Sequence, residues 1–260
     1  MTKVKMQKRR INSISKKSYI KNLSIQFSLD GFSFCISNLH TKEIHHFGSF
    51  LFEETVATPE LLLTKIETIV NDTTLLNQSF EAVTIIHQNN LSTLVPTSLF
   101  DEKNMQAYLE YNIKTFSSDF ITFDSILQAN AKNVYVPYMN INNFFFQKFG
   151  EFEYKHHTTI LLEKLLLHSK NNTQKQLFVH VSKNQLDIIV IENSKLLLLN
   201  TFHFNTKNDF IYYILFIAEQ LQLNPEEIAL TFLGEISYEL ICIRSRLLII
   251  MRFLTCFPFT

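Results

Sequence analysis

The sequence predicts an α/β protein with two units of the same element order: three strands, a helix and a fourth strand (β-β-β-α-β). Alternating apolar residues mark three closely spaced strands near residue 23 and three more near residue 176. In both places an amphipathic helix follows, and a short apolar strand comes after the helix. We therefore expect two lobes with mixed sheets. The duplication is one of topology and not of sequence.

The first unit begins with two alternating runs, Leu23–Leu29 and Phe32–Asn38, joined by Asp30-Gly31, for which we expect a type I′ turn. A third strand is predicted near Glu43 to Glu53. A helix is then predicted from Thr58 on, because a hydroxyl N-cap is followed by a proline and an acid. Apolar residues at helical spacing form one face of it: Leu62, Ile66, Ile69 and Val70. The unit ends with a buried strand, residues 82–87.

The second unit repeats this order. Two-residue turns at Lys183-Asn184 and Asn193-Ser194 separate three strands, at residues 176–182, 186–192 and 195–204. A helix is predicted around Asp209 to Leu221, with Phe210, Ile214, Ile217 and Leu221 on one face. The last strand is predicted at Ile228–Gly234.

The chain between the units alternates strands and helices. Strands are predicted at residues 91–96, 121–127, 133–138 and 151–157, and helices at residues 102–111, 141–149 and 158–169. We therefore divide the chain into a basic flexible arm (1–21), a first lobe (22–170) with an inserted subdomain (about 91–127), and a second lobe with a C-terminal helix (171–260).

Charge is distributed unevenly along a chain whose formal net charge is zero. Residues 1–21 hold eight Lys or Arg and no acid, which leaves 16 basic and 24 acidic residues elsewhere. Nucleic-acid-binding domains are basic as a whole, so we expect no nucleic-acid partner. The arm lacks the apolar stretch of a signal peptide, and the three cysteines have no short spacing, which favours a cytoplasmic protein. The apolar C-terminus carries Arg244, Arg246 and Arg252, so we predict an amphipathic helix and no transmembrane segment.

Only four glycines are present, and no two of them lie within ten residues of each other. Motifs built on two neighbouring glycines are therefore excluded: the dinucleotide fingerprint, the P-loop and the nucleophile elbow. The scarcity of glycine is itself informative about function, because backbone that approaches a phosphate closely usually requires it.

The duplicated order resembles the actin-like ATPase (ribonuclease H-like) fold. Within that superfamily the chain is most similar to the branch that contains the pilus protein PilM and the secretion protein GspL, and to an uncharacterised bacterial family. The runs that carry the resemblance are EAVTIIHQNNLSTLVP, DEKNMQAYLEYNI, ITFDSIL and NVYVPYMNINNFFFQKFG. It covers roughly residues 23–245. In the PilM branch the extra subdomain of the first lobe binds a short peptide from an inner-membrane partner.

The resemblance implies three nucleotide-binding motifs, and the sequence departs from each of them. In the first, D-x-G-[TS], Ser28 stands where the acid belongs, and Asp30-Gly31 makes the turn before Ser33. The second, D-x-G-G-G-T, falls on residues 180–185, which contain no glycine and start with His180. The third, a glycine pair after the last strand, is reduced to Gly234. If a nucleotide binds at all, we expect Ser28, Asp30, Gly31, Ser33 and Gly234 to contact it, with the helix N-termini near Thr58 and Thr206.

Other clusters favour structural roles. The pairs His45-His46 and His156-His157 lie on predicted strands, where neighbouring side chains point to opposite faces, so we expect solvated or edge histidines and no metal site. Asp187 is expected on a solvated strand face, and Cys35 in the core. The aromatic runs Phe144–Phe146 and Tyr212-Tyr213 lie on predicted helices, which leaves some of these rings for a docking surface.

The sequence thus favours a non-catalytic actin-like scaffold or adaptor in the cytoplasm, with no cofactor, no metal and no catalytic residues. Its partner would be a protein, with a peptide of a membrane-associated protein as the form implied by the PilM resemblance and residues 91–127 as its binding region. The alternative is a divergent ATPase or kinase of the same superfamily, with ATP as its cofactor.

Overall fold

The computed structural model describes residues 20–223 and 228–234 of the chain. Two compact units divide between Leu161 and Leu162, and each is described by itself. The basic arm and the predicted C-terminal helix lie outside the described residues. The predicted domain boundary at residue 170 stays a prediction.

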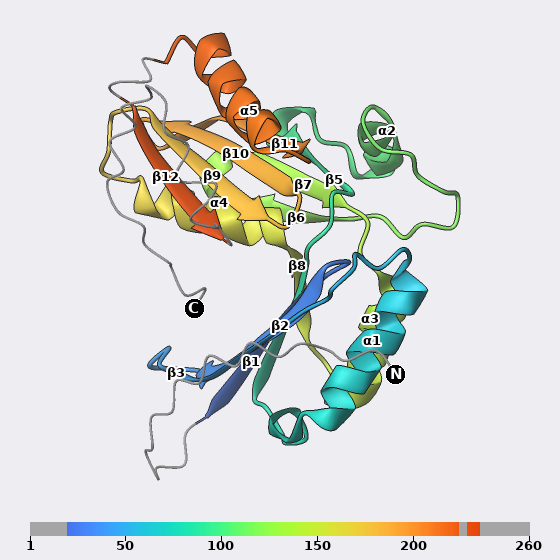
Figure 1. Ribbon diagram of the computed structural model, residues 1–260. Helices are drawn as coiled ribbons and strands as arrows, with labels where there is room; N and C mark the ends of the chain where they lie inside the picture. The colour runs from blue at the N-terminus through green and yellow to red at the C-terminus, as the bar shows by residue number, and fades with distance from the viewer. Residues whose placement is uncertain (1–19, 224–227, 235–260) are drawn as a thin grey trace. The chain divides into compact units, whose positions relative to one another are not determined.

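The first unit contains a mixed five-stranded sheet in the order β3-β2-β1-β4-β8 (Figure 1). β1, β2 and β3 are antiparallel neighbours, whereas β4 pairs parallel with β1 and β8 pairs parallel with β4. The strands are β1 Lys21–Ser28, β2 Gly31–Asn38, β3 Ile44–Leu51, β4 Ala82–His87 and β8 Glu153–His156.

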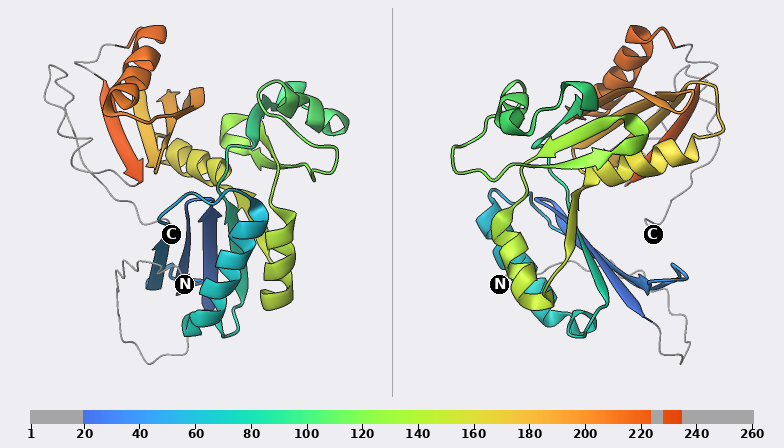
Figure 2. Two further views of the ribbon diagram at one scale, coloured as in Figure 1. Left: turned by 45° about the vertical axis from the view of Figure 1, so that its right-hand side comes forward. Right: turned by 180° about the vertical axis from the view of Figure 1, so that it is seen from behind.

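Two helices cover one face of this sheet, α1 (Pro59–Asp72) and α3 (Met139–Phe149), and they lie side by side (Figure 2). α1 begins as predicted, because the Thr58 hydroxyl accepts a hydrogen bond from the Leu61 N–H and Pro59 is the first helical residue. Its apolar face packs on alternate residues of the first strands. The core they form includes Leu23, Ile25, Phe27, Phe32, Phe34, Leu62, Ile66, Ile69, Val70, Ile141 and Phe145.

A small antiparallel sheet, ordered β5-β7-β6, is inserted between β4 and α3. Its strands are β5 Ser92–Pro96, β6 Thr122–Ile126 and β7 Ala131–Tyr135. The predicted helix at residues 102–111 forms as a 3₁₀ turn followed by α2 (Met105–Glu110). Other 3₁₀ turns lie at Thr74–Leu76, Thr97–Leu99 and Leu127–Ala129. Val95, Leu109, Val134 and Val136 form a separate small core of this insert.

The second unit has a four-stranded sheet in the order β11-β10-β9-β12. The strands are β9 Gln176–Ser182, β10 Gln185–Glu192, β11 Lys195–His203 and β12 Ala229–Gly234. β12 pairs parallel with β9, so both units repeat one scheme, in which the fourth strand returns beside the first. Asn193 and Ser194 both have positive φ (51° and 61°), as the type I′ turn between β10 and β11 requires.

Helix α5 (Lys207–Gln220) makes the crossover of the second unit and begins at a capping box. The Thr206 hydroxyl accepts from the Asp209 N–H (3.2 Å), while the Asp209 carboxylate accepts from the Thr206 N–H (3.0 Å). Phe210, Ile214 and Ile217 pack on the sheet. Helix α4 (His157–His168) contains the division between the two units.

The type I′ turn expected at Asp30-Gly31 is wrong. Leu29 and Asp30 form the two-residue loop, and Gly31 already pairs with Ser28. Neither Asp30 nor Gly31 has a positive φ. Glycine is needed at position 31 for another reason, because a Cβ there would lie 2.8 Å from the carbonyl oxygen of Phe50 in β3.

Replacing Thr206 by alanine should lower the free energy of unfolding by about 1 kcal/mol, because the side-chain half of the capping box is lost. Thr64→Ala in the exposed middle of α1 is the control and should be neutral or slightly stabilising, since alanine is the better helix former. Urea denaturation followed by circular dichroism measures both. Equal free energies for Thr206→Ala and the wild type would contradict the role of the cap.

Candidate functional site

The first hairpin is held by contacts within the protein. Ser28 ends β1, and its hydroxyl accepts a hydrogen bond from the Asp30 N–H (3.1 Å). The Asp30 carboxylate accepts from the Thr55 hydroxyl (2.5 Å), and the carbonyl of Asp30 accepts from the Phe52 N–H (2.9 Å). Ser33 lies inside β2, opposite Gln26 and Ser49. The predicted nucleotide residues of this hairpin therefore lie together, but β1 ends in a hydroxyl side chain where a carboxylate would serve Mg²⁺.

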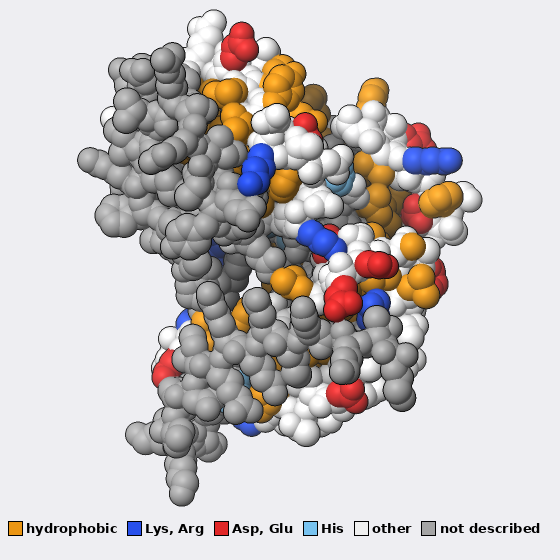
Figure 3. Space-filling view, viewed as in Figure 1, with side chains coloured by type: hydrophobic (Ala, Val, Ile, Leu, Met, Phe, Trp, Pro, Cys, Tyr) orange, Lys and Arg blue, Asp and Glu red, His pale blue; other side chains and the backbone are white. Residues whose placement is uncertain are grey.

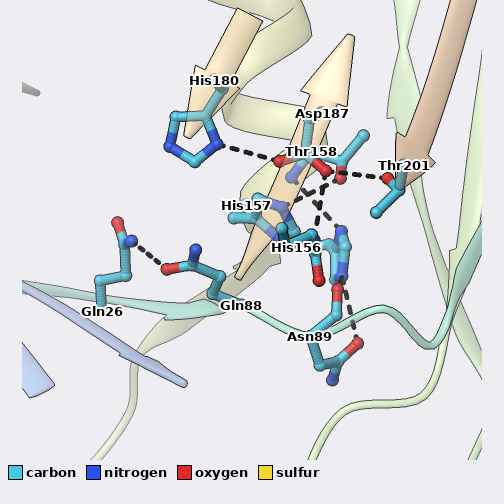
Figure 4. Close-up of polar contacts among 10 residues, drawn as sticks. Gln26, Gln88, Asn89, His156, His157, Thr158, His180, Asp187 and Thr201 are labelled. Atoms are coloured by element: carbon cyan, nitrogen blue, oxygen red, sulfur yellow. Dashed lines mark hydrogen bonds and ion pairs between the residues drawn. The ribbon is translucent and has the colours of Figure 1, made fainter. Parts of the chain in front are cut away.

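The second hairpin contains a hydrogen-bonded ladder across three strands. His180 on β9 lies directly opposite Asp187 on β10, and Asp187 lies opposite Thr201 on β11. The His180 Nδ1 is 2.9 Å from Asp187 Oδ2, and the Thr201 hydroxyl donates to Asp187 Oδ1 (2.8 Å) (Figure 4). Gln185 Nε2 donates to the same oxygen (3.2 Å). His180 thus occupies the position expected for the acid and bonds to a carboxylate within the sheet.

The solvated strand position expected for Asp187 is wrong. Only 2% of this residue is exposed. A buried carboxylate is costly unless polar partners surround it, and His180, Thr201 and Gln185 supply them. The ladder is therefore a built feature of the second unit that the sequence analysis did not find.

Gly234 ends β12 with a φ of +86°. A Cβ at this position would lie 2.2 Å from the carbonyl oxygen of Val181 on the neighbouring strand β9. Any side chain would therefore collide with backbone. The sheet itself requires this glycine, whether or not a ligand is present.

Amide side chains occupy the carboxyl ends of β1 and β4 in the first unit. Gln26 Nε2 donates to Gln88 Oε1 (2.6 Å) (Figure 4). Asn89, just beyond β4, bridges the chain segment that enters the insert and the segment that leaves it. Its Oδ1 accepts from the Leu91 N–H (2.9 Å), and its Nδ2 donates to the Val136 carbonyl (3.0 Å). Ligands of α/β sheets often bind at this edge, where these residues offer amides and no carboxylate.

His156 lies at the end of β8, an edge strand of the sheet as expected, but it is buried, so a solvated position is wrong for it. Its Nδ1 accepts from the Thr158 N–H (3.3 Å), which leaves Nε2 as the protonated nitrogen of a neutral ring. Nε2 then donates to the Asn89 carbonyl oxygen (3.1 Å). His45 and His157 are buried as well. Within the described ranges, no group of three or more His, Cys, Asp or Glu side chains is placed to hold a metal ion.

Asp124 of the insert reaches the start of α4. Its Oδ2 accepts from the His156 N–H (2.9 Å) and from the Thr159 hydroxyl (2.7 Å), and its Oδ1 accepts from Tyr135 Oη (3.2 Å). Burial raises the pKa of the Asp124 carboxyl, while these hydrogen bonds and Lys155 act in the opposite direction. The carboxylate caps the positive end of α4 from outside the helix. It thereby fixes the insert to the end of β8.

His87 lies at the end of β4 on the face that α3 covers. Its Nδ1 accepts from the Tyr138 N–H (3.3 Å), so its Nε2 donates to Asn142 Oδ1 (2.9 Å). Burial lowers the pKa of His87 to about 4, although the bond to Asn142 favours the charged form. His87 is therefore a neutral core histidine at physiological pH.

The predicted aromatic surface divides into buried and exposed rings. Phe145 is fully buried and Phe144 packs against the core, whereas Phe146 is 62% exposed. Three adjacent phenylalanines cannot share one face of a helix, so only some of these rings are exposed, as predicted. Tyr213 stacks on Phe202 of β11, and Tyr212 is 60% exposed. The insert exposes further large apolar side chains: Leu99, Tyr111, Phe116, Phe120 and Leu127.

Comparison with solved structures supports the actin-like ATPase fold that the sequence analysis predicts. The chain is similar to a protein of Bacteroides thetaiotaomicron with an actin-like ATPase fold and unknown function, with 24% identity, a TM-score of 0.76 and 85% of each chain covered. It is less similar to a chain of the PilM–PilN type IV pilus biogenesis complex (13% identity, TM-score 0.48, 80% of this chain and 67% of that chain covered). An Aquifex aeolicus member of the Ppx/GppA family follows, with 8% identity, a TM-score of 0.35 and 83% and 65% covered.

The predicted α/β fold with mixed sheets is thus confirmed as an actin-like ATPase fold. A protein family described as "Protein of unknown function (DUF3822)" matches residues 11–244. Among curated proteins, none matches the sequence. No helix in the described part of the chain is long and apolar enough to cross a membrane.

The depressed pKa of His87 should make stability depend on pH. Between pH 6.5 and about pH 4 the unfolded chain binds a proton at this residue and the folded chain does not, so acidification favours unfolding. His87 should contribute up to about 1.4 kcal/mol per pH unit to the slope of the unfolding free energy in this window. Urea titrations of wild type and His87→Asn at several pH values measure it. His40→Asn, at an exposed histidine, should keep the wild-type slope. An unchanged slope in His87→Asn would contradict the assignment.

Proposed function

We propose that this chain, which belongs to the DUF3822 family of proteins of unknown function, is a non-catalytic actin-like adaptor that acts through protein–protein contacts in the cytoplasm. The observation that carries the proposal is the ladder of His180, Asp187 and Thr201. It stands where the fold's second phosphate-binding turn would begin with an acid, and its polar groups bond to one another. Phosphate binding at such a turn needs glycine backbone that approaches the ligand, and Lys183-Asn184 supplies none.

The other two nucleotide motifs support the same proposal. Ser28 and Asp30 bond to the hairpin and to Thr55 instead of presenting a carboxylate at the end of β1. The surroundings of Gly234 are occupied by the Val181 carbonyl, so the one remaining glycine of the third motif serves the sheet. These residues fit a magnesium–nucleotide complex poorly. We therefore derive no catalytic step from them.

The insert is our candidate for the partner-binding region. It carries a concentration of exposed large apolar side chains around a small core of its own, and Tyr111 (85%) and Leu127 (84%) are the most exposed of them. Exposed apolar surface of this kind marks protein interfaces more often than chance placement does. We propose an apolar peptide segment as the ligand, with a membrane-associated protein as its source.

Titration with Mg-ATP tests the non-catalytic part of the proposal. A nucleotide present at 100 times its dissociation constant stabilises a protein by about 2.7 kcal/mol, which raises the Tm of a chain of this size by about 5–11 °C. We expect no saturable change of Tm up to millimolar Mg-ATP in differential scanning fluorimetry. A saturable rise that Ser28→Ala and Ser33→Ala reduce would establish the alternative, a divergent ATPase or kinase.

Charged substitutions in the insert test the partner region. The double variant Phe116→Asp and Leu127→Asp should reduce capture of the partner at least tenfold in quantitative affinity purification, because a charge in an apolar contact is not solvated. Phe146→Asp, at an exposed phenylalanine outside the insert, is the matched control and should capture it like the wild type. Both variants should keep the wild-type Tm, since they change exposed residues. Equal capture by all three proteins would refute this assignment.

A further inference from the structure

Helix α5 is apolar on its outer side as well as on its inner side. Phe210, Ile214 and Ile217 face the sheet, as expected for a crossover helix. Tyr212, Leu215 and Phe216 follow each other at helical spacing on the opposite side and are exposed. Figure 3 shows hydrophobic side chains over α5 at the top of the view. A helix that is apolar all round is normally covered on all sides.

Helix α1 provides an internal reference for this outer side. Both helices have 14 residues, follow a threonine N-cap and make the same crossover between the third and fourth strands of their unit. Counted from the caps, their buried residues occupy the same four positions: Leu62, Ile66, Ile69 and Val70 in α1, and Phe210, Ile214, Ile217 and Ala218 in α5. The outer positions differ in kind. Thr64, Glu67 and Thr68 in α1 correspond to Tyr212, Leu215 and Phe216 in α5.

The outer aromatic rings of α5 are organised rather than scattered. Tyr212 and Phe216 stack with ring centroids 6.0 Å apart, and Tyr212 meets Tyr213 edge to face at 5.5 Å. Tyr213 in turn stacks on Phe202 of β11, with centroids 4.5 Å apart. The outer rings are thereby held against the sheet, so little side-chain entropy remains to be lost when a partner covers them.

We infer that the outer side of α5, formed by Asn208, Tyr212, Leu215, Phe216 and Glu219, is a self-association surface that takes a second copy of this chain. A twofold axis at the middle of the helix would place Tyr212 against Leu215 of the second copy. The same axis would place Asn208 against Glu219, so that an amide donor meets a carboxylate at both ends of the seam, the line of contact between the two α5 helices. An isologous interface requires this kind of self-complementarity.

The charge of the chain is compatible with this occupant. The formal net charge is zero, because the eight basic residues of the arm balance the eight excess acids elsewhere, so the net charge of two whole copies produces no long-range repulsion. The outer side of α5 carries a single charge, Glu219, and the proposed arrangement pairs it with a hydrogen-bond donor. A seam of one helix is smaller than a standard interface, so we expect a weak and reversible dimer.

The experiment is sedimentation equilibrium of the full chain from about 10 µM to about 1 mM, the range in which a small interface associates. We expect the apparent mass to rise toward twice the monomer mass. The variant Tyr212→Glu with Phe216→Glu should remain a monomer throughout. The matched control is Thr64→Glu with Thr68→Glu, at the corresponding positions of α1, and it should dimerise like the wild type. A wild type that stays monomeric, or an α5 variant that still dimerises, overturns the inference.

Charge exchange tests the antiparallel arrangement without removing an apolar residue. Asn208→Glu places two carboxylates opposite each other at both ends of the seam and should weaken dimerisation about two- to fivefold per contact. Adding Glu219→Lys to the same chain should restore it, because each end then forms an ion pair. An Asn208→Glu variant that dimerises as tightly as the wild type, or a double variant that stays weakened, contradicts this pairing. Folding of each variant is checked by its Tm.

Discussion

The fold depends on burying one side of a crossover helix against a mixed sheet. In each unit the fourth strand can pair parallel with the first only if the chain crosses over the sheet, and the crossing segment must cover it. α1 and α5 meet this requirement with the same four buried positions, although the residues themselves differ. The inner side of these helices is therefore constrained by the fold, whereas the outer side is free to vary. That freedom is what makes the outer side informative about function.

Polar residues at the strand ends show a second pattern: they bond within the protein. Asp187 is surrounded by His180, Thr201 and Gln185, and Asp124 by His156, Thr159 and Tyr135. Burying a carboxylate is tolerated only when partners replace water, and each of these carboxylates has them. In an enzyme of this architecture the same edge would leave acidic groups available to a metal ion. Here the carboxylates stabilise strand and helix junctions.

Most of the fold could be predicted from the sequence, because strands and helices that cover a core have strict apolar periods. Part of the ladder of His180, Asp187 and Thr201 could also have been predicted from the sequence. A two-residue turn at Lys183-Asn184 places His180 opposite Asp187 by counting outward along both strands. The pairing of Thr201 with Asp187 could not have been predicted. A bulge shifts the register between Val190 and Ile191, whereas counting from the turn at Asn193-Ser194 would pair Asp187 with Asn200. The burial of His156 was missed for a similar reason, since its partners Asn89 and Thr158 meet it only in three dimensions.

The scarcity of glycine gains a structural meaning from Gly31 and Gly234. Both residues stand where the backbone of a neighbouring strand approaches too closely for a Cβ, at the Phe50 and Val181 carbonyl oxygens. Each would therefore be needed in this fold even if no ligand had ever bound there. A phosphate site requires additional glycines, whose amides face outward toward the ligand, and the turn at Lys183-Asn184 has none to offer. Gly31 and Gly234 thus mark positions where two neighbouring strands of one sheet approach each other closely. The sheets do not explain the exposed apolar side chains of the insert and of α5, and our proposals of protein–protein contact rest on these side chains.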